Sequence, residues 1–154
     1  MSTIHVRPAT PADGRFIADS WLNSYKGAYH VKRVPSQVYW AKHRRAIAAL
    51  ADRSEVWVAS DPLDPWTIWG WCCVEPEGSQ LIVHFCYVKS ALRGHRIASV
   101  LMRDVIARHD PDHIFWTHDT KQTRAFITGL HDGGYLDADI PLTYDPYLLH
   151  RSPQ

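Results

Sequence analysis

The chain has 154 residues, 45% of them hydrophobic, which suits one domain with a buried core and leaves no room for a second. Its 17 basic and 16 acidic residues give a net charge of +1, which excludes the electrostatic profile of a protein that binds duplex nucleic acid or an anionic membrane. Residues 3–15 are polar and include two prolines, so we expect no signal peptide, and the sequence contains no apolar run of about 18 residues that could cross a bilayer. Its three cysteines form no disulfide framework, so we expect a cytoplasmic protein.

The N-terminal third predicts one strand and two helices. Residues 4–8 predict a short strand, and residues 10–13 predict a helix start with proline in the first turn. Aromatic and aliphatic residues then recur at helical spacing, namely Phe16, Ile17, Trp21 and Tyr25. A second helix is expected from residue 36 to about residue 51.

The middle of the chain predicts three consecutive strands. Residues 55–60 and 67–74 predict the two strands of a hairpin, with a turn at residues 61–65 between them. A further turn is expected at residues 75–79. The nearly continuous apolar run of residues 80–88 is typical of a central strand that is covered on both faces.

The C-terminal half alternates helices with strands. We expect a helix at residues 98–108, a buried strand at 114–117, a helix at 123–131 and one or two closing strands within 136–144. This order predicts a single α/β domain.

The segment of residues 88–102 runs from an apolar strand end through a basic turn with one glycine into an amphipathic helix. The first turn of a helix has unpaired backbone N–H groups and the positive end of the helix dipole. A phosphate is therefore the natural ligand of such a turn. Arg93 and Arg96 add positive charge at the same place.

This segment resembles the cofactor-binding motif of the GCN5-related N-acetyltransferase (GNAT) family. Val88, Arg93, Gly94 and Ala98 match the motif, as do the apolar residues Leu92, Ile97 and Leu101. Arg96 departs from it, because it replaces the central glycine that lets a pyrophosphate approach the backbone. The guanidinium either reaches a phosphate from the side or fills the space that the phosphate would use.

The resemblance extends over nearly the whole chain, because the order of predicted elements is that of the acetyltransferase fold. It implies a single domain over residues 1–154, with a short C-terminal tail from about residue 146. The implied architecture is a central mixed, mostly antiparallel sheet flanked by helices. Gly134 and Tyr135 resemble the Gly-Phe pair that ends the last helix of the family.

The resemblance implies that acetyl-CoA is the cofactor. Backbone donors in the turn would hold its pyrophosphate, and the pantetheine arm would lie along the end of the preceding strand. The cofactor residues implied are Cys86, Tyr87, Val88, Arg93, Gly94, His95, Arg96, Ala98 and Ser99.

Proton removal from an acceptor amine points first to His84, because histidine titrates in the useful pH range. In the arylalkylamine branch of the family, a catalytic histidine lies four residues before the motif's apolar residue, as His84 lies before Val88. By alternation it would share a strand face with Cys86 and Val88. The alternative is a neutral core histidine bonded to backbone. Glu75 and Glu77 are weaker candidates for the base.

A proton donor for the leaving thiolate is harder to assign. Many family members carry a tyrosine four residues before the Gly-Phe pair, where this chain has Leu130. His131 and Tyr144 are substitute candidates, each weighed against an ordinary structural role. A thiolate can also leave without a dedicated acid, at some cost in rate.

The resemblance implies an acceptor site between the first two helices, the strand of His84 and the C-terminal strands, where aromatic side chains can stack on a cationic amine. The candidates are Trp21, Tyr25, Tyr29 and, less directly, Tyr147. The alternative for all of them is core packing. The histidines and aspartates of 109–113 and 118–119 are interpreted as loop residues, and no metal site is expected.

The residues and the resemblance together predict an acetyl-CoA-dependent N-acetyltransferase that acts on an unidentified amine. The main alternative is a catalytically degenerate domain that serves as a binding or structural subunit, which the departures at Arg96 and Leu130 favour. A third hypothesis is an acyl-CoA sensor. A homodimer or a larger assembly is compatible with the exposed sheet edge.

Overall fold

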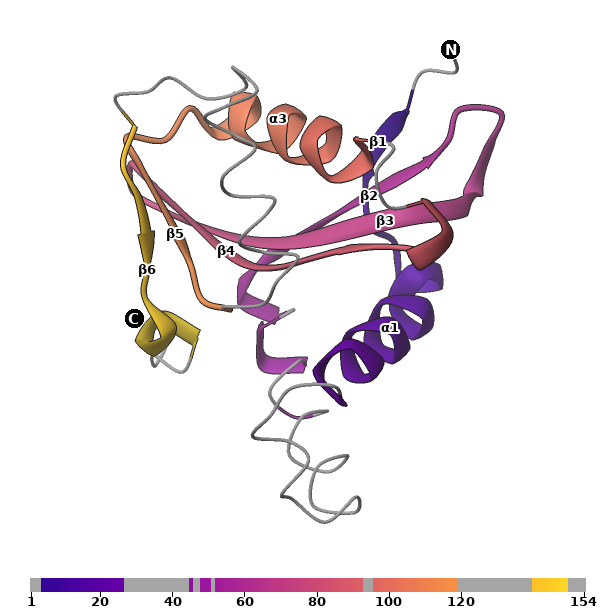
Figure 1. The fold of residues 1–154 in the computed structure, drawn as a ribbon, viewed down its shortest axis with the longest axis horizontal. Coiled ribbons are helices and arrows are strands. Elements are labelled where there is room, and N and C mark those ends of the chain that lie inside the picture. Colours follow the sequence, from indigo (N-terminus) through magenta and orange to yellow (C-terminus); the bar gives the residue numbers. More distant parts are fainter. Residues whose placement is uncertain are drawn as a thin grey trace.

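The computed structural model describes residues 4–26, 45, 48–50, 52–92, 96–118 and 140–149. In this part of the chain, one six-stranded sheet has the order β1-β2-β3-β4-β5-β6 (Figure 1). The strands are β1 (His5–Pro8), β2 (Glu55–Asp61), β3 (Asp64–Glu77), β4 (Gln80–Val88), β5 (His113–Trp116) and β6 (Leu142–Tyr144). The helices are α1 (Gly14–Lys26) and α3 (Ile97–His109), with the short 3-10 helices η1 (Pro11–Asp13), η3 (Ser90–Leu92) and η4 (Pro146–Leu149).

Strands β1 to β4 pair antiparallel, whereas β5 lies parallel to β4 and β6 lies parallel to β5. The predicted mixed, mostly antiparallel α/β sheet is therefore confirmed. The helix that starts after Thr10 and the helix that follows the basic turn are confirmed as well. Most of the expected helix at 36–51 and all of that at 123–131 lie outside the described residues. Among the described helices, none combines the length and apolarity that crossing a membrane requires.

The turn predicted at residues 75–79 exists but is shorter than expected. Strand β3 continues through Glu77, and the hairpin turn consists of Gly78 and Ser79 alone, where Gly78 has a φ of +57°. Proline is tolerated at position 76 because β2 ends its pairing with β3 at Glu55 and Val74. Pro76 therefore has no neighbour on the β2 side that requires its missing N–H.

Two hydrophobic clusters hold the two layers of helices on the sheet. Figure 1 shows α3 on one face and α1 on the other. The cluster under α3 includes Leu81, Val83 and Leu101, and the cluster under α1 includes Trp21, Trp71 and Phe85. The sheet is thus covered on both faces, as the apolar run of β4 predicts.

An ion pair ties β1 to the start of α1. Asp13 is buried and receives hydrogen bonds from Arg7, with Nη1 to Oδ2 at 2.7 Å and Nη2 to Oδ1 at 3.0 Å. The same carboxylate accepts the backbone N–H of Thr10 at 2.8 Å, which closes the helix start as a capping box. The Arg7 guanidinium, chiefly by its hydrogen bond, lowers the pKa of Asp13 to about 2.

This pKa predicts an acid-sensitive contribution to folding. The pKa of aspartate in an unfolded chain is about 3.9, so the folded state binds its proton less readily and gains stability above about pH 4. As pH falls from about 4 to about 2, wild type should lose on the order of 2 kcal/mol through this carboxyl, and Asp13→Asn should not. Urea unfolding over a pH series measures the difference. Asp19→Asn, at an exposed carboxylate 3.8 Å from Arg15, is the control and should follow wild type. An unaltered acid slope in Asp13→Asn would contradict this role.

Gly70 allows β3 and β4 to approach closely at the end of β4. A methyl group at this position would lie 2.5 Å from the Tyr87 carbonyl oxygen and 3.3 Å from Val88 Cγ2. Since a backbone atom cannot move as a side chain can, Gly70→Ala should displace the end of β4 and lose about 1 to 3 kcal/mol of stability.

Chemical denaturation measures this loss, and Gly14→Ala is its matched control. Gly14 has helical angles, and a methyl group there meets no described atom within 4 Å. The control should be neutral or gain up to about 1 kcal/mol. Equal stability of the two variants would show that the close approach at Gly70 is not limiting.

Candidate functional site

Strands β4 and β5 part in the middle of the sheet. Their pairing covers only Gln80–Val83 with His113–Trp116, followed by a backbone bond from Thr117 N to Val83 O at 3.2 Å. Beyond this point β4 continues to Val88, paired with β3 on its other side. Within the described residues, no β5 residue pairs with residues 84–88. Among the described residues, β4 and β5 thus diverge after Val83 and Trp116, and we call this place the opening.

The opening coincides with a β-bulge at His84. The register between β3 and β4 passes from Cys73 opposite Phe85 to Val74 opposite Val83, so that His84 is an extra residue. The bulge shifts the alternation by one, because Val83 and Cys86 both pack in the cluster under α3. The expectation that His84 shares a face with Cys86 and Val88 was wrong for this reason.

His84 instead joins a buried polar network. Its side chain is fully buried, and Nε2 lies 2.8 Å from Glu75 Oε1. The same carboxylate oxygen receives a hydrogen bond from Arg53 Nε at 3.2 Å, just before β2. Arg53 also donates to the carbonyl of Leu148 in η4 at 3.4 Å. Histidine, carboxylate and guanidinium thus form one connected group on one side of the opening.

The network continues on the β5 side through Thr117 and His118. Thr117 Oγ1 lies 3.3 Å from His84 Nδ1 and 3.0 Å from His118 Nδ1. The His118 ring stands edge-on to Phe85, with centroids 5.4 Å apart, so it lies where the two strands part. The sequence pattern does not point to Arg53, Thr117 or His118, because no local spacing links residues that meet only when the strands pair.

The start of α3 has an unusual backbone. Arg96, the residue just before Ile97, has φ 62° and ψ 18°, in the left-handed region that favours glycine. The turn therefore keeps the backbone shape that a glycine would adopt, although the residue is arginine. The Arg96 side chain is exposed, Ala98 and Ser99 are half-buried, and the first turn has no acidic residue. Arg93, Gly94 and His95 lie outside the described residues.

The predicted cofactor residues on β4 lie on both faces of the sheet, some toward α3 and one toward α1. Cys86 and Val88 pack toward α3, and burial raises the pKa of the Cys86 thiol to about 12. The thiol is thus neutral near pH 7 and serves packing rather than nucleophilic chemistry. Tyr87 belongs to the α1 side, edge-on to Phe16 at 6.2 Å between ring centroids.

A groove of about 710 Å³ lies between α1 and the end of β4. Its polar side chains come mainly from α1, and Tyr87 of β4 and Ser90 of η3 line its other side. The Lys89 Nζ atom lies 5.3 Å from the Phe16 ring centroid, near the same groove. The residues lining the groove are Ala12, Arg15, Phe16, Asp19, Ser20, Asn23, Ser24, Tyr87 and Ser90.

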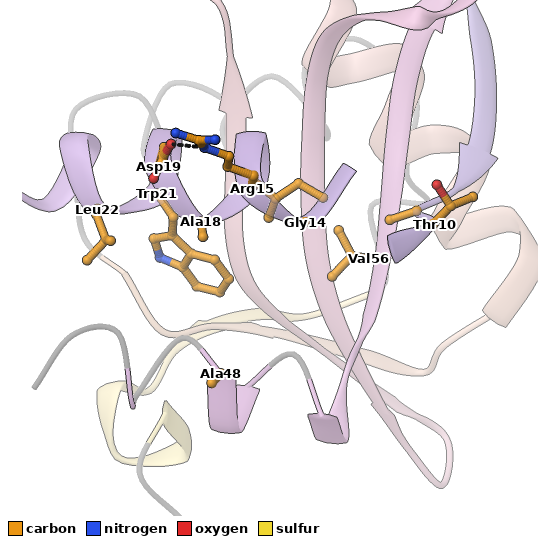
Figure 2. A pocket seen from close by; sticks show the side chains of 11 residues that line it. Thr10, Gly14, Arg15, Ala18, Asp19, Trp21, Leu22, Ala48 and Val56 are labelled. Carbon is orange, nitrogen blue, oxygen red and sulfur yellow. Dashed lines mark ion pairs between the residues drawn. The ribbon is translucent and has the colours of Figure 1, made fainter. Parts of the chain in front are cut away.

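A second cavity, of about 680 Å³, lies between α1 and the start of β2, and no residue of β4 lines it (Figure 2). Trp21, a candidate for the acceptor site, lines this cavity and not the groove beside Tyr87. It is fully buried and stacks on Phe85 with centroids 5.4 Å apart. Trp21 is therefore a core residue, which agrees with the alternative that the aromatic candidates serve core packing. Tyr29 and the Tyr25 side chain lie outside the described residues.

Tyr144, a candidate proton donor, lies on β6 in register with Trp116 and, through it, with Val83. Two strand spacings amount to about 10 Å, so Tyr144 lies across β5 from the bulge. Its side chain is 43% exposed and Tyr147 is 85% exposed. His131 and Leu130 lie outside the described residues.

His109 and His113 each lie against a side chain of another segment. His109 Nε2 lies 3.1 Å from Glu55 Oε2, and His113 Nε2 lies 2.7 Å from Thr143 Oγ1. In the part of the chain that the structure describes, no three histidine, cysteine or acidic side chains gather as a metal site.

No family model and no curated protein matches the sequence. Many solved structures share the fold. A GNAT family acetyltransferase from Brucella melitensis in complex with acetyl-CoA has a TM-score of 0.57 and 20% identity, with 82% of each chain covered. The histone acetyltransferase HPA2 and related acetyltransferase from Corynebacterium glutamicum has a TM-score of 0.61 and 20% identity, with 84% of each chain covered.

AAC(6')-Iy in complex with the bisubstrate analog CoA-S-monomethyl-acetylneamine has a TM-score of 0.51 and 12% identity, with 86% of this chain and 90% of the other covered. At these identities the similarity establishes the fold. The chain has the GNAT acetyltransferase fold.

The backbone at Arg96 predicts an inverted order of two variants. At an ordinary position glycine is less stable than alanine by about 0.5 to 1 kcal/mol. At a left-handed position the Cβ atom of alanine costs about 1 to 2 kcal/mol, so Arg96→Gly should be more stable than Arg96→Ala. Chemical denaturation of both variants compares them, and both lack the guanidinium. The ordinary order, with alanine the more stable, would contradict the left-handed conformation.

Proposed function

We propose that this protein is an acetyl-CoA-dependent N-acetyltransferase that acts on an amine. The observation that carries the proposal is the opening between β4 and β5, together with a helix start after β4 in the chain that has a glycine-like backbone and no acidic residue in its first turn. Backbone groups at a strand edge suit an amide-bearing arm, and a helix start suits a phosphate. The complexes of similar folds with acetyl-CoA and with a CoA bisubstrate analog support the same cofactor here.

The residues at this opening fit the two ends of such a cofactor. The backbone donors at the start of α3, with Ala98 and Ser99 in its first turn, and the exposed Arg96 guanidinium would hold the pyrophosphate. The β4 edge at residues 86–88 would hold the pantetheine arm. Arg93, Gly94 and His95 remain predicted contributors. Acetyl-CoA, when bound, supplies an acetyl thioester that an amine can attack.

The groove beside α1 is our candidate for the acceptor site. Its lining includes Asp19 and Asn23 from the helix and the Tyr87 ring from β4, which suit a cationic, hydrogen-bonding amine. An amine is largely protonated at neutral pH and must lose a proton before it attacks. His84, at the bulge beside the opening, is our candidate base. Tyr144 and His131 remain candidates for protonating the thiolate.

The cofactor proposal predicts that acetyl-CoA stabilises the fold. A ligand at 100 times its dissociation constant should add about 2.7 kcal/mol, which a thermal-shift titration detects. If Arg96 holds a phosphate, Arg96→Ala and Arg96→Gly should both weaken the affinity by about 10- to 150-fold, since a charged hydrogen bond contributes about 1.5 to 3 kcal/mol. Arg103→Ala, with the same charge change at an exposed position of α3, is the control and should bind like wild type.

The other outcomes separate the alternatives. Tighter binding by Arg96→Gly would mean that the arginine occupies the place of the phosphate. No stabilisation by acetyl-CoA at millimolar concentration would leave the binding or structural subunit as the function. Stabilisation without thiol release over a panel of amines would indicate a sensor rather than an enzyme.

A further inference from the structure

A histidine joins the C-terminal end of α3 to the first residue of β2. We infer that His109 is a pH-sensitive switch: its imidazolium holds the last turn of α3 on Glu55, and loss of one proton breaks one of its two hydrogen bonds. The inference concerns the far end of α3 from Arg96, and it does not depend on the proposed acetyl transfer.

Both ring nitrogens of His109 face atoms that only accept hydrogen bonds. Nδ1 lies 2.9 Å from the carbonyl oxygen of Val105, one helical turn earlier. Nε2 lies 3.1 Å from Oε2 of Glu55. A carbonyl oxygen and a carboxylate have no hydrogen to give, so each ring nitrogen must be the donor. A neutral imidazole has a single N–H, and therefore both bonds exist together only when His109 is an imidazolium.

The position of His109 favours the charged ring. It is the last residue of α3, where the negative end of the helix dipole attracts a cation. The charged groups of the described residues that act on it are Glu55 of β2, which is attractive, and the neighbouring Arg108, which is repulsive. Arg108 donates a hydrogen bond to Asp104 at 2.8 Å, which offsets part of this repulsion. Strands β3 and β4 meet α3 through an apolar cluster that includes Cys72 and Leu81.

The Glu55 carboxylate is held in place by a tryptophan. Its Oε1 accepts a hydrogen bond from Trp57 Nε1 at 3.2 Å, while Oε2 is the oxygen that faces His109. The guanidinium of Arg108 lies over the Trp57 ring, 4.7 Å from the ring centroid. Because one carboxylate binds both side chains, the indole N–H of Trp57 reports on the charge of His109.

The sign of the pH dependence follows from these contacts. Burial lowers the pKa of His109, but the hydrogen bonds to Val105 and Glu55 outweigh it and leave the pKa above its ordinary value of about 6.5. A group whose pKa rises on folding stabilises the folded state fully below its unfolded pKa, and this stabilisation is lost as pH rises through the folded pKa. The end of α3 is thus held more firmly on β2 in weakly acidic solution than in alkaline solution.

Nitrogen NMR of histidine-labelled protein tests the protonation state directly. The His109 signals, assigned by their loss in His109→Gln, should show two N–H groups below the titration midpoint. This midpoint should lie above that of the urea-unfolded protein, which is about 6.5. The indole N–H signal of Trp57, assigned by its loss in Trp57→Phe, should shift with the same midpoint.

Glu55→Gln tests the partner of the switch, because it keeps the size of the side chain and removes its charge. It should lower the His109 midpoint by about one pH unit, a tenfold loss of proton affinity. Asp112→Asn is the matched control, since it makes the same charge change at an exposed residue, and it should titrate like wild type. His113, whose Nε2 lies 2.7 Å from the Thr143 hydroxyl, should be unaffected in both variants.

Hydrogen exchange measures the attachment of the helix. The Asp110 amide, bonded to the Ile106 carbonyl at 2.8 Å, should exchange about 3- to 10-fold more slowly in wild type than in His109→Gln below the midpoint. Above the midpoint the two rates should converge.

Three results would overturn the inference: a wild-type His109 midpoint at or below the unfolded value, an unmoved midpoint in Glu55→Gln, or equal exchange of wild type and His109→Gln at every pH. The first needs no variant of the switch itself. None of the measurements uses acetyl-CoA or an amine, so failure of the proposed acetyl transfer would leave their outcome unchanged.

Discussion

The single extra residue at His84 is the constraint on which the site depends. Two strands in register would continue their hydrogen bonds to the end of the sheet, and β4 would have no free edge. The bulge increases the local twist and bends β4 away from β5 at the point where pairing stops, after Val83 and Trp116. It also turns one polar side chain toward Glu75 while the apolar residues on either side keep their contacts with the two helical layers. The opening and the buried position of His84 thus have one cause.

At position 96 the backbone has the conformation that the motif's glycine would adopt, although the residue is arginine. The backbone before α3 is held in the left-handed region although its side chain pays a steric penalty of about 1 to 2 kcal/mol there. Backbone strain of this kind persists only where the surroundings fix it, and it is concentrated at binding sites. The substitution therefore keeps the shape of the turn and adds a positive charge on an exposed side chain next to it. This arrangement favours an anion beside the helix over a simple loss of the site.

The sequence predicted the elements that have a local pattern and failed where partners are distant. The strand at residues 80–88 and the helix after the basic turn follow from apolar runs and helical spacing. The role of His84 stays a prediction, because it rests on a resemblance to one branch of the family. The dyad of His84 with Glu75 was missed because residues 75–79 resemble a turn, which removes Glu75 from the strand that faces His84. A bulge leaves no signature in the pattern of one strand, since it is a property of the register between two. The fold could thus be predicted from the sequence, while the hydrogen-bond partners within the site could not.

The buried polar network is itself an argument for chemistry at this place. Each polar group in the network would be better solvated by water at the protein surface. Aliphatic side chains could fill the same place in the sheet without the free-energy cost of burying polar groups. Arg53, Glu75, His84 and Thr117 come from four separate segments, and each satisfies another's hydrogen-bonding capacity. Such a network stabilises the fold only when it is complete, so one missing member leaves its neighbours buried without their partners. Places where a sequence departs from the simplest packing are expected to be functional, and this one lies beside the gap between β4 and β5.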